Sequence, residues 1–272
     1  MSYDVKRRIH LTRASAARRP EAMDRITQST ATADGRPLRE NRIVAALPLP
    51  ERQQMLDAMT TVTLQVRTVL FEPGGVVDAV YFPTDGVISL VTPVHTGAIV
   101  EVATIGNEGV VGVPLVQPLT GFAVRAITQV AGHGLRLEAA TFTEFVASSR
   151  TFQTLIDRYT QALFGQIAQA AACNRLHSSE ERLSRWLLMS RDRVESDEFM
   201  ITQEFLSQML GARRSTVSVS AGILQRAGLI RYSRGNVTIV DRAGLEAVSC
   251  ECYGVIKAEL DRVSRKPQGP KA

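Results

Sequence analysis

The segment Ile201–Leu224 constrains the fold most, because its pattern is that of two short helices joined by a tight turn. Residues 203–210 place their apolar side chains on one side of a helix, and Thr202 is a suitable N-cap. Gly211 follows at a point where the chain must turn and where a positive φ is often required. A second helix is expected over residues 213–227, since apolar residues recur there with helical spacing. The segment therefore predicts a helix-turn-helix.

A basic hairpin follows these two helices. Leu229–Tyr232 and Val237–Val240 are short β-prone runs on either side of a Ser-Arg-Gly-Asn turn, which is typical of a wing. Between residues 205 and 236 every charged residue is an arginine. These are Arg213, Arg214, Arg226, Arg231 and Arg234. A solvated helical face would normally carry charges of both signs, so a face with arginines alone favours a polyanion as partner. We prefer DNA binding to the alternative, in which the winged helix makes only protein contacts.

The whole chain has the composition of an ordinary globular protein. Its 272 residues suffice for two small domains, and 44% of them are hydrophobic, with a net charge of +5. No apolar run approaches the ~20 residues that span a bilayer, and the basic N-terminus lacks the apolar core of a secretory signal. These features predict a cytoplasmic protein with no membrane partner. Residues 1–40 are expected to form a disordered basic arm and residues 263–272 a disordered tail.

Residues 61–137 have the pattern of an all-β roll. Short apolar runs alternate there with turn residues such as Pro73-Gly74-Gly75 and Asp85-Gly86. Such a barrel can hold one small ligand or can be filled by its own side chains, and the sequence leaves both open. His95 and His133 are far apart in sequence, and no catalytic constellation is evident, so the chain is not expected to be an enzyme.

Three cysteines, Cys173, Cys250 and Cys252, are too few for a disulfide framework. Cys250 and Cys252 form a C-x-C pair, but no second pair completes the four ligands that a zinc or iron–sulfur site usually takes. They are interpreted as small hydrophobic residues near a terminal helix, with no metal and no cofactor expected.

A long helix is predicted over residues 151–177. Its apolar positions recur at mixed three- and four-residue spacing and form a seam, which we interpret as a dimer interface. The seam residues are Leu155, Tyr159, Leu163, Gln166, Ile167 and Ala170. Packing of the same face on the chain's own barrel is the alternative.

The order of these parts resembles the cyclic-AMP receptor protein/Fnr family of bacterial transcription regulators over roughly residues 41–260. The segments Val69–Gly75, Val80–Pro83 and Asp85-Gly86 are similar to the start of that family's sensor roll, and Ile201–Val217 to its helix-turn-helix. The resemblance implies an α+β fold: a cyclic-nucleotide-binding-like β-roll (41–150), a long dimerisation helix (151–177) and a C-terminal winged helix-turn-helix (178–262). It also implies a homodimer that regulates transcription from near-palindromic operators in double-stranded DNA. RNA polymerase is a further partner of many members.

The resemblance also implies which residues contact DNA. Base contacts are expected from Arg214, Ser215, Ser218 and Val219. Phosphate contacts are expected from Thr202, Arg213, Thr216 and Arg234. An arginine at a helix N-terminus can form a bidentate contact with guanine O6 and N7. The family often has Glu at the position of Ser215 and Arg at that of Val219, so the operator should differ from the best-known ones.

The sensor departs from the members that bind cyclic nucleotides. They hold the cyclic phosphate with a Gly-Glu pair and, about ten residues later, an Arg-Ser. The candidate pocket residues here are Gly106, Glu108, Gly112 and Arg125. Small or apolar residues stand where the phosphate-binding arginine is expected. Arg125 lies a few residues after that position, so its side chain would point in a different direction from the strand. We therefore expect a regulator that does not respond to cyclic AMP and whose effector is unknown. The alternative is a small-molecule-binding β-barrel protein whose helical C-terminus mediates protein contacts.

Overall fold

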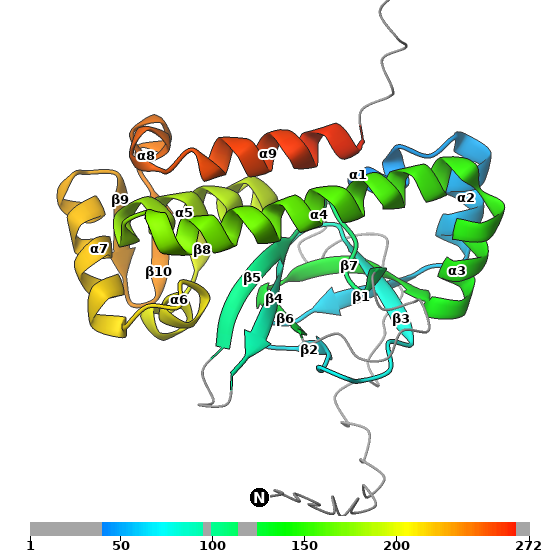
Figure 1. Ribbon diagram of the computed structural model, residues 1–272, viewed down its shortest axis with the longest axis horizontal. Coiled ribbons are helices and arrows are strands. Elements are labelled where there is room, and N and C mark those ends of the chain that lie inside the picture. Colours follow the sequence, from blue (N-terminus) through cyan, green and yellow to red (C-terminus); the bar gives the residue numbers. More distant parts are fainter. Residues whose placement is uncertain (1–39, 95–98, 114–123, 265–272) are drawn as a thin grey trace, which may run out of the picture.

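A computed structural model describes residues 40–94, 99–113 and 124–264, and it has the predicted α+β class (Figure 1). Residues 1–39 and 265–272, which hold nearly all of the predicted arm and tail, lie outside the described residues, as does His95. No helix within the described ranges is long and apolar enough to cross a membrane.

The N-terminal half is a roll of two antiparallel sheets, preceded by α1 (Arg42–Ala45) and α2 (Leu49–Asp57). One sheet has the order β1-β7-β3 and the other β2-β6-β4-β5. The strands are β1 (Thr60–Leu64), β2 (Val69–Phe71), β3 (Ala79–Pro83), β4 (Val87–Pro93), β5 (Ile99–Ile105), β6 (Arg125–Val130) and β7 (Gly132–Glu138). The described interior is packed with apolar side chains, including Val80, Phe82, Ile88, Ala126 and Leu137, so the roll acts as a rigid support for the helices around it.

Three helices follow the roll: α3 (Ala139–Ser148), α4 (Arg150–Leu176) and α5 (Ser179–Val194). The Ser149 hydroxyl accepts from Phe152 N and caps α4, while Ser178 and Glu181 form a capping box at the start of α5. Figure 1 shows α4 running along the roll, with α9 on its other side. Helix α5 then leads into the C-terminal part, so it belongs to the connection between the two halves.

The C-terminal part consists of β8 (Glu198–Met200), α6 (Gln203–Met209), α7 (Arg214–Arg226), β9 (Ile230–Ser233), β10 (Asn236–Ile239), α8 (Arg242–Val248) and α9 (Cys252–Val263). The three strands pair antiparallel in the order β8-β10-β9. Helix α9 turns back and packs along α4 and α5. Helix α9 therefore connects the C-terminal part to α4.

The predicted dimer seam on α4 is packed against other parts of the same chain. Five of its six residues are buried within the same chain, and Ile167 is partly buried against the same core. Gln166 donates to the carbonyl of Thr104 on β5 at 3.1 Å, and Tyr159 packs on Gly109. The seam is thus covered within its own chain, which leaves little of its surface for a partner. The exposed apolar residues of α4 lie elsewhere: Phe164, Ala168, Ala171, Ala172 and Leu176.

Candidate nucleic-acid interface

The two helices of the predicted motif are α6 and α7. The Thr202 hydroxyl accepts from Phe205 N at 3.2 Å and so caps α6, as its sequence position suggested. Gly211 has φ +57 in the turn that follows, a conformation that residues with a Cβ rarely adopt. Arg213 is extended, with ψ 146, and α7 begins directly after it. Local chemistry therefore fixes both helix ends and the turn between them.

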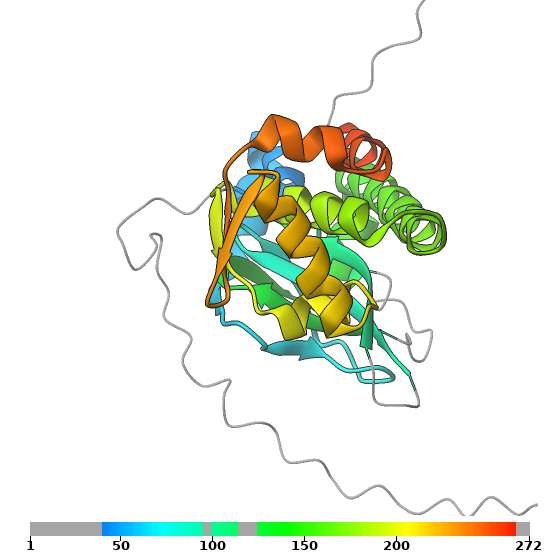
Figure 2. The same ribbon diagram turned by 90° about the vertical axis from the view of Figure 1, so that its left-hand side faces the viewer.

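Helix α7 has a buried face and an open face. Val217, Ala221 and Leu224 are buried against α5 and α6. Arg214 and Ser215 are exposed in its first turn, and Val219 is 61% exposed one turn later. Thr216 is partly exposed. Figure 2 shows α7 at the near side of the molecule, with no other element in front of it. Three of the four residues predicted to contact bases thus lie on an open helical face.

Ser218, the fourth of them, has an internal role. Its hydroxyl lies 2.8 Å from Gln203 Oε1 on α6 and 3.0 Å from the carbonyl of Arg214. A serine hydroxyl has one proton, so this donor is committed within the motif and only its acceptor lone pairs remain for other partners. The sequence showed that Ser218 is on the outer side of α7 but gave no sign of its bond to α6.

The hairpin of β9 and β10 lies beside the start of α6. Arg234 and Gly235 form its turn with φ values of +50 and +80, which matches a type I′ connection. The N–H of Ile201 donates to the carbonyl of Gly235 at 2.7 Å. The two predicted phosphate contacts Thr202 and Arg234 are distant in sequence, but they lie close together, one at the start of α6 and the other in the turn of the wing.

Five arginines give this surface its charge. Arg213, Arg214, Arg226, Arg231 and Arg234 are all exposed. None of them forms an ion pair with another residue in the described part of the chain. The N-terminus of α7 adds the positive end of a helix dipole. We call these five residues the basic surface, and its open geometry and single sign suit a phosphate backbone.

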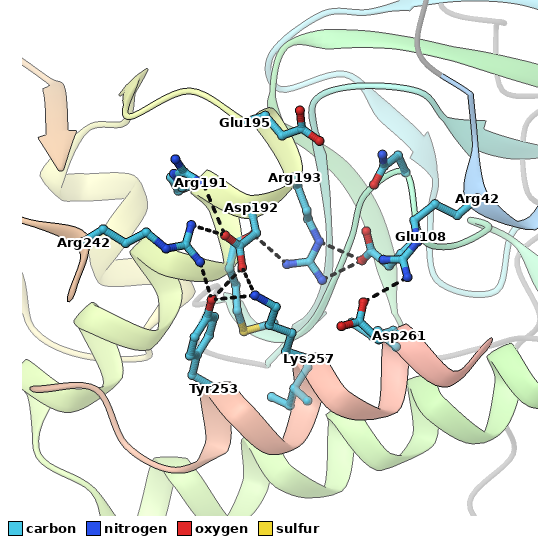
Figure 3. A pocket seen from close by; sticks show the side chains of 14 residues that line it. Arg42, Glu108, Arg191, Asp192, Arg193, Glu195, Arg242, Tyr253, Lys257 and Asp261 are labelled. Carbon is cyan, nitrogen blue, oxygen red and sulfur yellow. Dashed lines mark hydrogen bonds and ion pairs between the residues drawn. The ribbon is translucent and has the colours of Figure 1, made fainter. Parts of the chain in front are cut away.

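The candidate effector residues do not form a common pocket. Glu108 forms a buried ion pair with Arg193 of α5, at 2.7 Å between Oε1 and Nη2 (Figure 3). A Cβ on Gly106 would lie 2.5 Å from Arg193 Cγ, so this glycine makes room for the arginine. Arg125 pairs instead with Glu72 at 2.8 Å near the surface, and Gly112 packs on β3. The loop that resembles a phosphate cradle thus holds α5, the helix that connects the two halves.

A polar cavity of about 350 Å³ lies beside this ion pair, between α1, α5 and α9 (Figure 3). Asp192 accepts from Arg242 and from the hydroxyl of Tyr253, each at 2.7 Å. Although burial opposes it, these hydrogen bonds lower the pKa of Asp192. Across the cavity, Arg42 donates to Asp261 at 2.9 Å. These bonds join α5 to α8 and α9, and α9 to α1, so the charges they involve already have partners.

A second polar contact joins β5 to α5. Glu101 accepts from Trp186 Nε1 at 3.0 Å and from the Ser89 hydroxyl at 2.6 Å. Burial raises the pKa of Glu101 from 4.5 to about 7, against the lowering effects of these bonds and of the nearby charges of Arg185 and Arg193. The folded protein therefore holds a proton on Glu101 at a pH where the unfolded chain has lost it.

This proton predicts that stability falls as pH rises. The folded pKa lies above the unfolded one, so the contribution is complete below about pH 4.5 and is lost as pH approaches 7. We expect a decrease in the free energy of unfolding on the order of 2 kcal/mol across this range. Urea denaturation of the wild type and of Glu101→Gln at pH 5 and pH 8 would measure it. The glutamine should abolish this part of the decrease; an equal decrease in both proteins would contradict the assignment.

Comparison with known proteins supports the same interpretation of the C-terminal part. The model of the Crp-like helix-turn-helix domain matches residues 181–248, which include α6, α7 and the wing. No curated protein sequence matches the chain. The match favours DNA binding over a helical C-terminus used only for protein contacts.

Solved structures share the fold over most of this chain. A putative Crp/Fnr-family regulator from Eubacterium rectale is 16% identical, with a TM-score of 0.60 over 77% of this chain and 99% of the other. FixK2 from Bradyrhizobium japonicum is 12% identical, with a TM-score of 0.61 over 71% and 98%. The c-di-GMP-responsive regulator CLP from Xanthomonas campestris is 14% identical, with a TM-score of 0.58 over 71% and 99%. At these identities the likeness establishes the fold, and the domain match identifies its helix-turn-helix. Residues 181–248 therefore match the Crp-like helix-turn-helix family, within a chain that has the fold of Crp/Fnr regulators.

Proposed function

We propose that this protein is a homodimeric, sequence-specific regulator that inserts α7 into the major groove and does not respond to cyclic AMP. The basic surface carries the proposal, since its five exposed arginines form no ion pair among the described residues and lie on or near an open recognition helix. Arg214, Ser215 and Val219 would read base edges. Arg213, Thr216, Thr202 and Arg234 would contact phosphates on either side of the groove.

The dimer would form through the exposed face of α4. Phe164 is 72% exposed in the middle of this helix, and Ala168, Ala171 and Ala172 continue the apolar stripe with small side chains. Small residues let two helices approach closely, while Phe164 would bury a large area against the partner. A two-fold axis along this stripe would set two copies of α7 for operator half-sites one DNA turn apart, roughly 34–36 Å.

The lack of a response to cyclic AMP follows from the partners of Glu108 and Arg125. Glu108 is committed to Arg193, and Arg125 to Glu72. A buried cyclic phosphate would need a charge-assisted partner, and breaking either ion pair to supply one would add its own cost. A different effector, or control by a protein partner, would have to act on the contacts between the roll and α5.

Selection of binding sites from random duplex DNA would test this function, with Arg214→Ala compared to the wild type. We expect enrichment of a near-palindrome. Arg214→Ala should lose about 1–3 kcal/mol of binding free energy and relax one position in each half-site. The matched control is the neighbouring Arg213→Ala, which should weaken all sequences alike and reduce the slope of log affinity against log salt by about one unit.

Other outcomes would overturn parts of the proposal. If Arg214→Ala leaves affinity and sequence preference unchanged, α7 does not read bases through this residue. If no sequence is enriched and binding does not weaken with salt, the basic surface has a partner other than DNA. Enrichment that requires added cyclic AMP would contradict the proposed independence from this nucleotide.

A further inference from the structure

Four potential metal ligands meet where α4 ends and α9 begins. Cys173 lies in the last turn of α4 and His177 directly follows this helix, while Cys252 begins α9 and Cys250 lies two residues before it. The three sulfur atoms and one ring nitrogen of His177 all lie within 4.8 Å of one another. The C-x-C pair that seemed incomplete in the sequence therefore gains two further ligands from a segment more than seventy residues earlier.

The distances suit a single tetrahedral ion. Cys173 Sγ lies 3.5 Å from Cys250 Sγ, and Cys252 Sγ lies 3.5 Å from His177 Nδ1. With metal–sulfur and metal–nitrogen bonds of about 2.3 and 2.0–2.1 Å, neighbouring ligands of a tetrahedral zinc are roughly 3.6–3.8 Å apart. The ligands of an iron–sulfur cluster are divided among two or more iron atoms, so all four would not lie this close to one another. Since all four ligand atoms lie within 4.8 Å of one another, modest side-chain shifts would bring them around one zinc ion.

The neighbouring groups are those that usually orient metal ligands. The second ring nitrogen of His177, Nε2, lies 3.2 Å from Oε1 of Glu251, which leaves Nδ1 facing the sulfurs. A carboxylate behind a histidine ligand in this way fixes the ring and raises its basicity. Gln169 Nε2 donates to Cys252 Sγ at 3.1 Å, as amide groups do to coordinating thiolates. These contacts involve residues that no other part of the proposed function uses.

The cluster is closed and lies apart from the main core. All three cysteines are at most 4% exposed, and they form a buried cluster separate from the large hydrophobic one. If the three cysteines were only small hydrophobic residues, as the sequence suggested, we would expect them to be part of the main core. A site with four protein ligands and little access to solvent is typical of structural zinc.

We propose that Cys173, His177, Cys250 and Cys252 bind one zinc ion per chain. Three thiolates and an imidazole favour this metal over hard cations such as Mg²⁺. The ion would fix the start of α9 to the end of α4. Since the wing and α8 precede α9 directly, the zinc would also hold the DNA-binding part against the helix that we propose for dimerisation.

The first test measures zinc in the full-length protein, purified in reducing buffer, loaded with Zn²⁺ and passed through gel filtration. We expect one zinc per chain by elemental mass spectrometry. His177→Ala should lose most of it, because a three-ligand site binds more weakly, whereas His177→Cys should restore it with a fourth thiolate. The matched control is His133→Ala in the roll, which should keep the full amount.

Cobalt and hydrogen exchange give two further readouts. Co²⁺ in place of zinc should produce the visible bands of a tetrahedral thiolate site, and His177→Cys should shift them. Removal of zinc by a chelator should increase amide exchange in residues 250–264 and at the end of α4, with little change in the strands of the roll.

Three results would overturn the proposal. The first is wild-type protein that holds no zinc after loading. The second is zinc that remains at full stoichiometry in both His177→Ala and Cys173→Ser/Cys250→Ser. The third is a Cys173–Cys250 disulfide, found without zinc when thiols are blocked at cell lysis, which would make the cluster a redox pair instead. Bound zinc without any change in exchange would show a site that does not fasten α9.

Discussion

Replacing Arg193 with alanine should destabilise the protein by about 3–5 kcal/mol, the usual cost of removing one partner from a buried ion pair. The side chains of Arg193 and Glu108 are each 5% exposed. Arg193 also donates to the carbonyls of Thr104 at 3.0 Å and Met189 at 3.2 Å. The alanine variant would leave the Glu108 carboxylate and these carbonyls without a charged donor, in a place that water reaches poorly. Urea denaturation followed by circular dichroism would measure the loss.

Arg191→Ala is the matched control, because it removes an arginine from the same helix two residues earlier. Arg191 pairs with Asp197 at 2.7 Å, but the carboxylate is largely solvated, so we expect a cost below about 1 kcal/mol. A second control, Glu108→Gln with Arg193→Met, removes both charges and should recover part of the stability lost in Arg193→Ala. Equal losses in Arg193→Ala and Arg191→Ala would show that the buried pair does not hold α5 to the roll.

Phe164→Glu should convert the proposed dimer into a folded monomer and weaken binding to a palindromic operator by on the order of a hundredfold or more. Phe164 is 72% exposed on α4, so a glutamate there costs little in the isolated chain. In a dimer about this stripe, two such carboxylates would meet across the axis and lose their water. Sedimentation velocity would report whether the variant is a monomer or a dimer. Comparing its binding to full and half operators would separate the loss of dimerisation from any loss of DNA contact by the single chain.

The control for this change is Leu49→Glu, since Leu49 on α2 is 76% exposed and lies on a different helix. This variant should remain dimeric and bind DNA as the wild type does. Leu163→Glu is not a suitable test, because Leu163 is only 4% exposed within its own chain and the charge would disrupt the core. If Phe164→Glu remains dimeric with unchanged affinity, the interface lies on another surface.

Most of the helix-turn-helix could be predicted from the sequence because its determinants are local. The cap at Thr202, the positive φ of Gly211 and the hairpin turn at Arg234-Gly235 each depend on residues within a few positions of one another. The α+β class followed in the same way, from the change from short alternating runs to helical spacing. The one-signed charge of the basic surface was also visible, since all five arginines fall within one short stretch.

The tertiary structure alone decided which surfaces and charges meet. The periodicity of α4 showed that one face is apolar. Contact with a partner chain and burial within the same chain both require this pattern, and the structure buries this face within its own chain. Glu108 and Arg193 are 85 residues apart, and Cys173 and Cys250 are 77 apart. Such pairs leave no periodic signal in the sequence, because their contact depends on how the sheets and helices pack and not on local backbone preference. The sequence thus determined the elements and the basic surface, and packing determined the ion pair, the exposed stripe and the cysteine cluster.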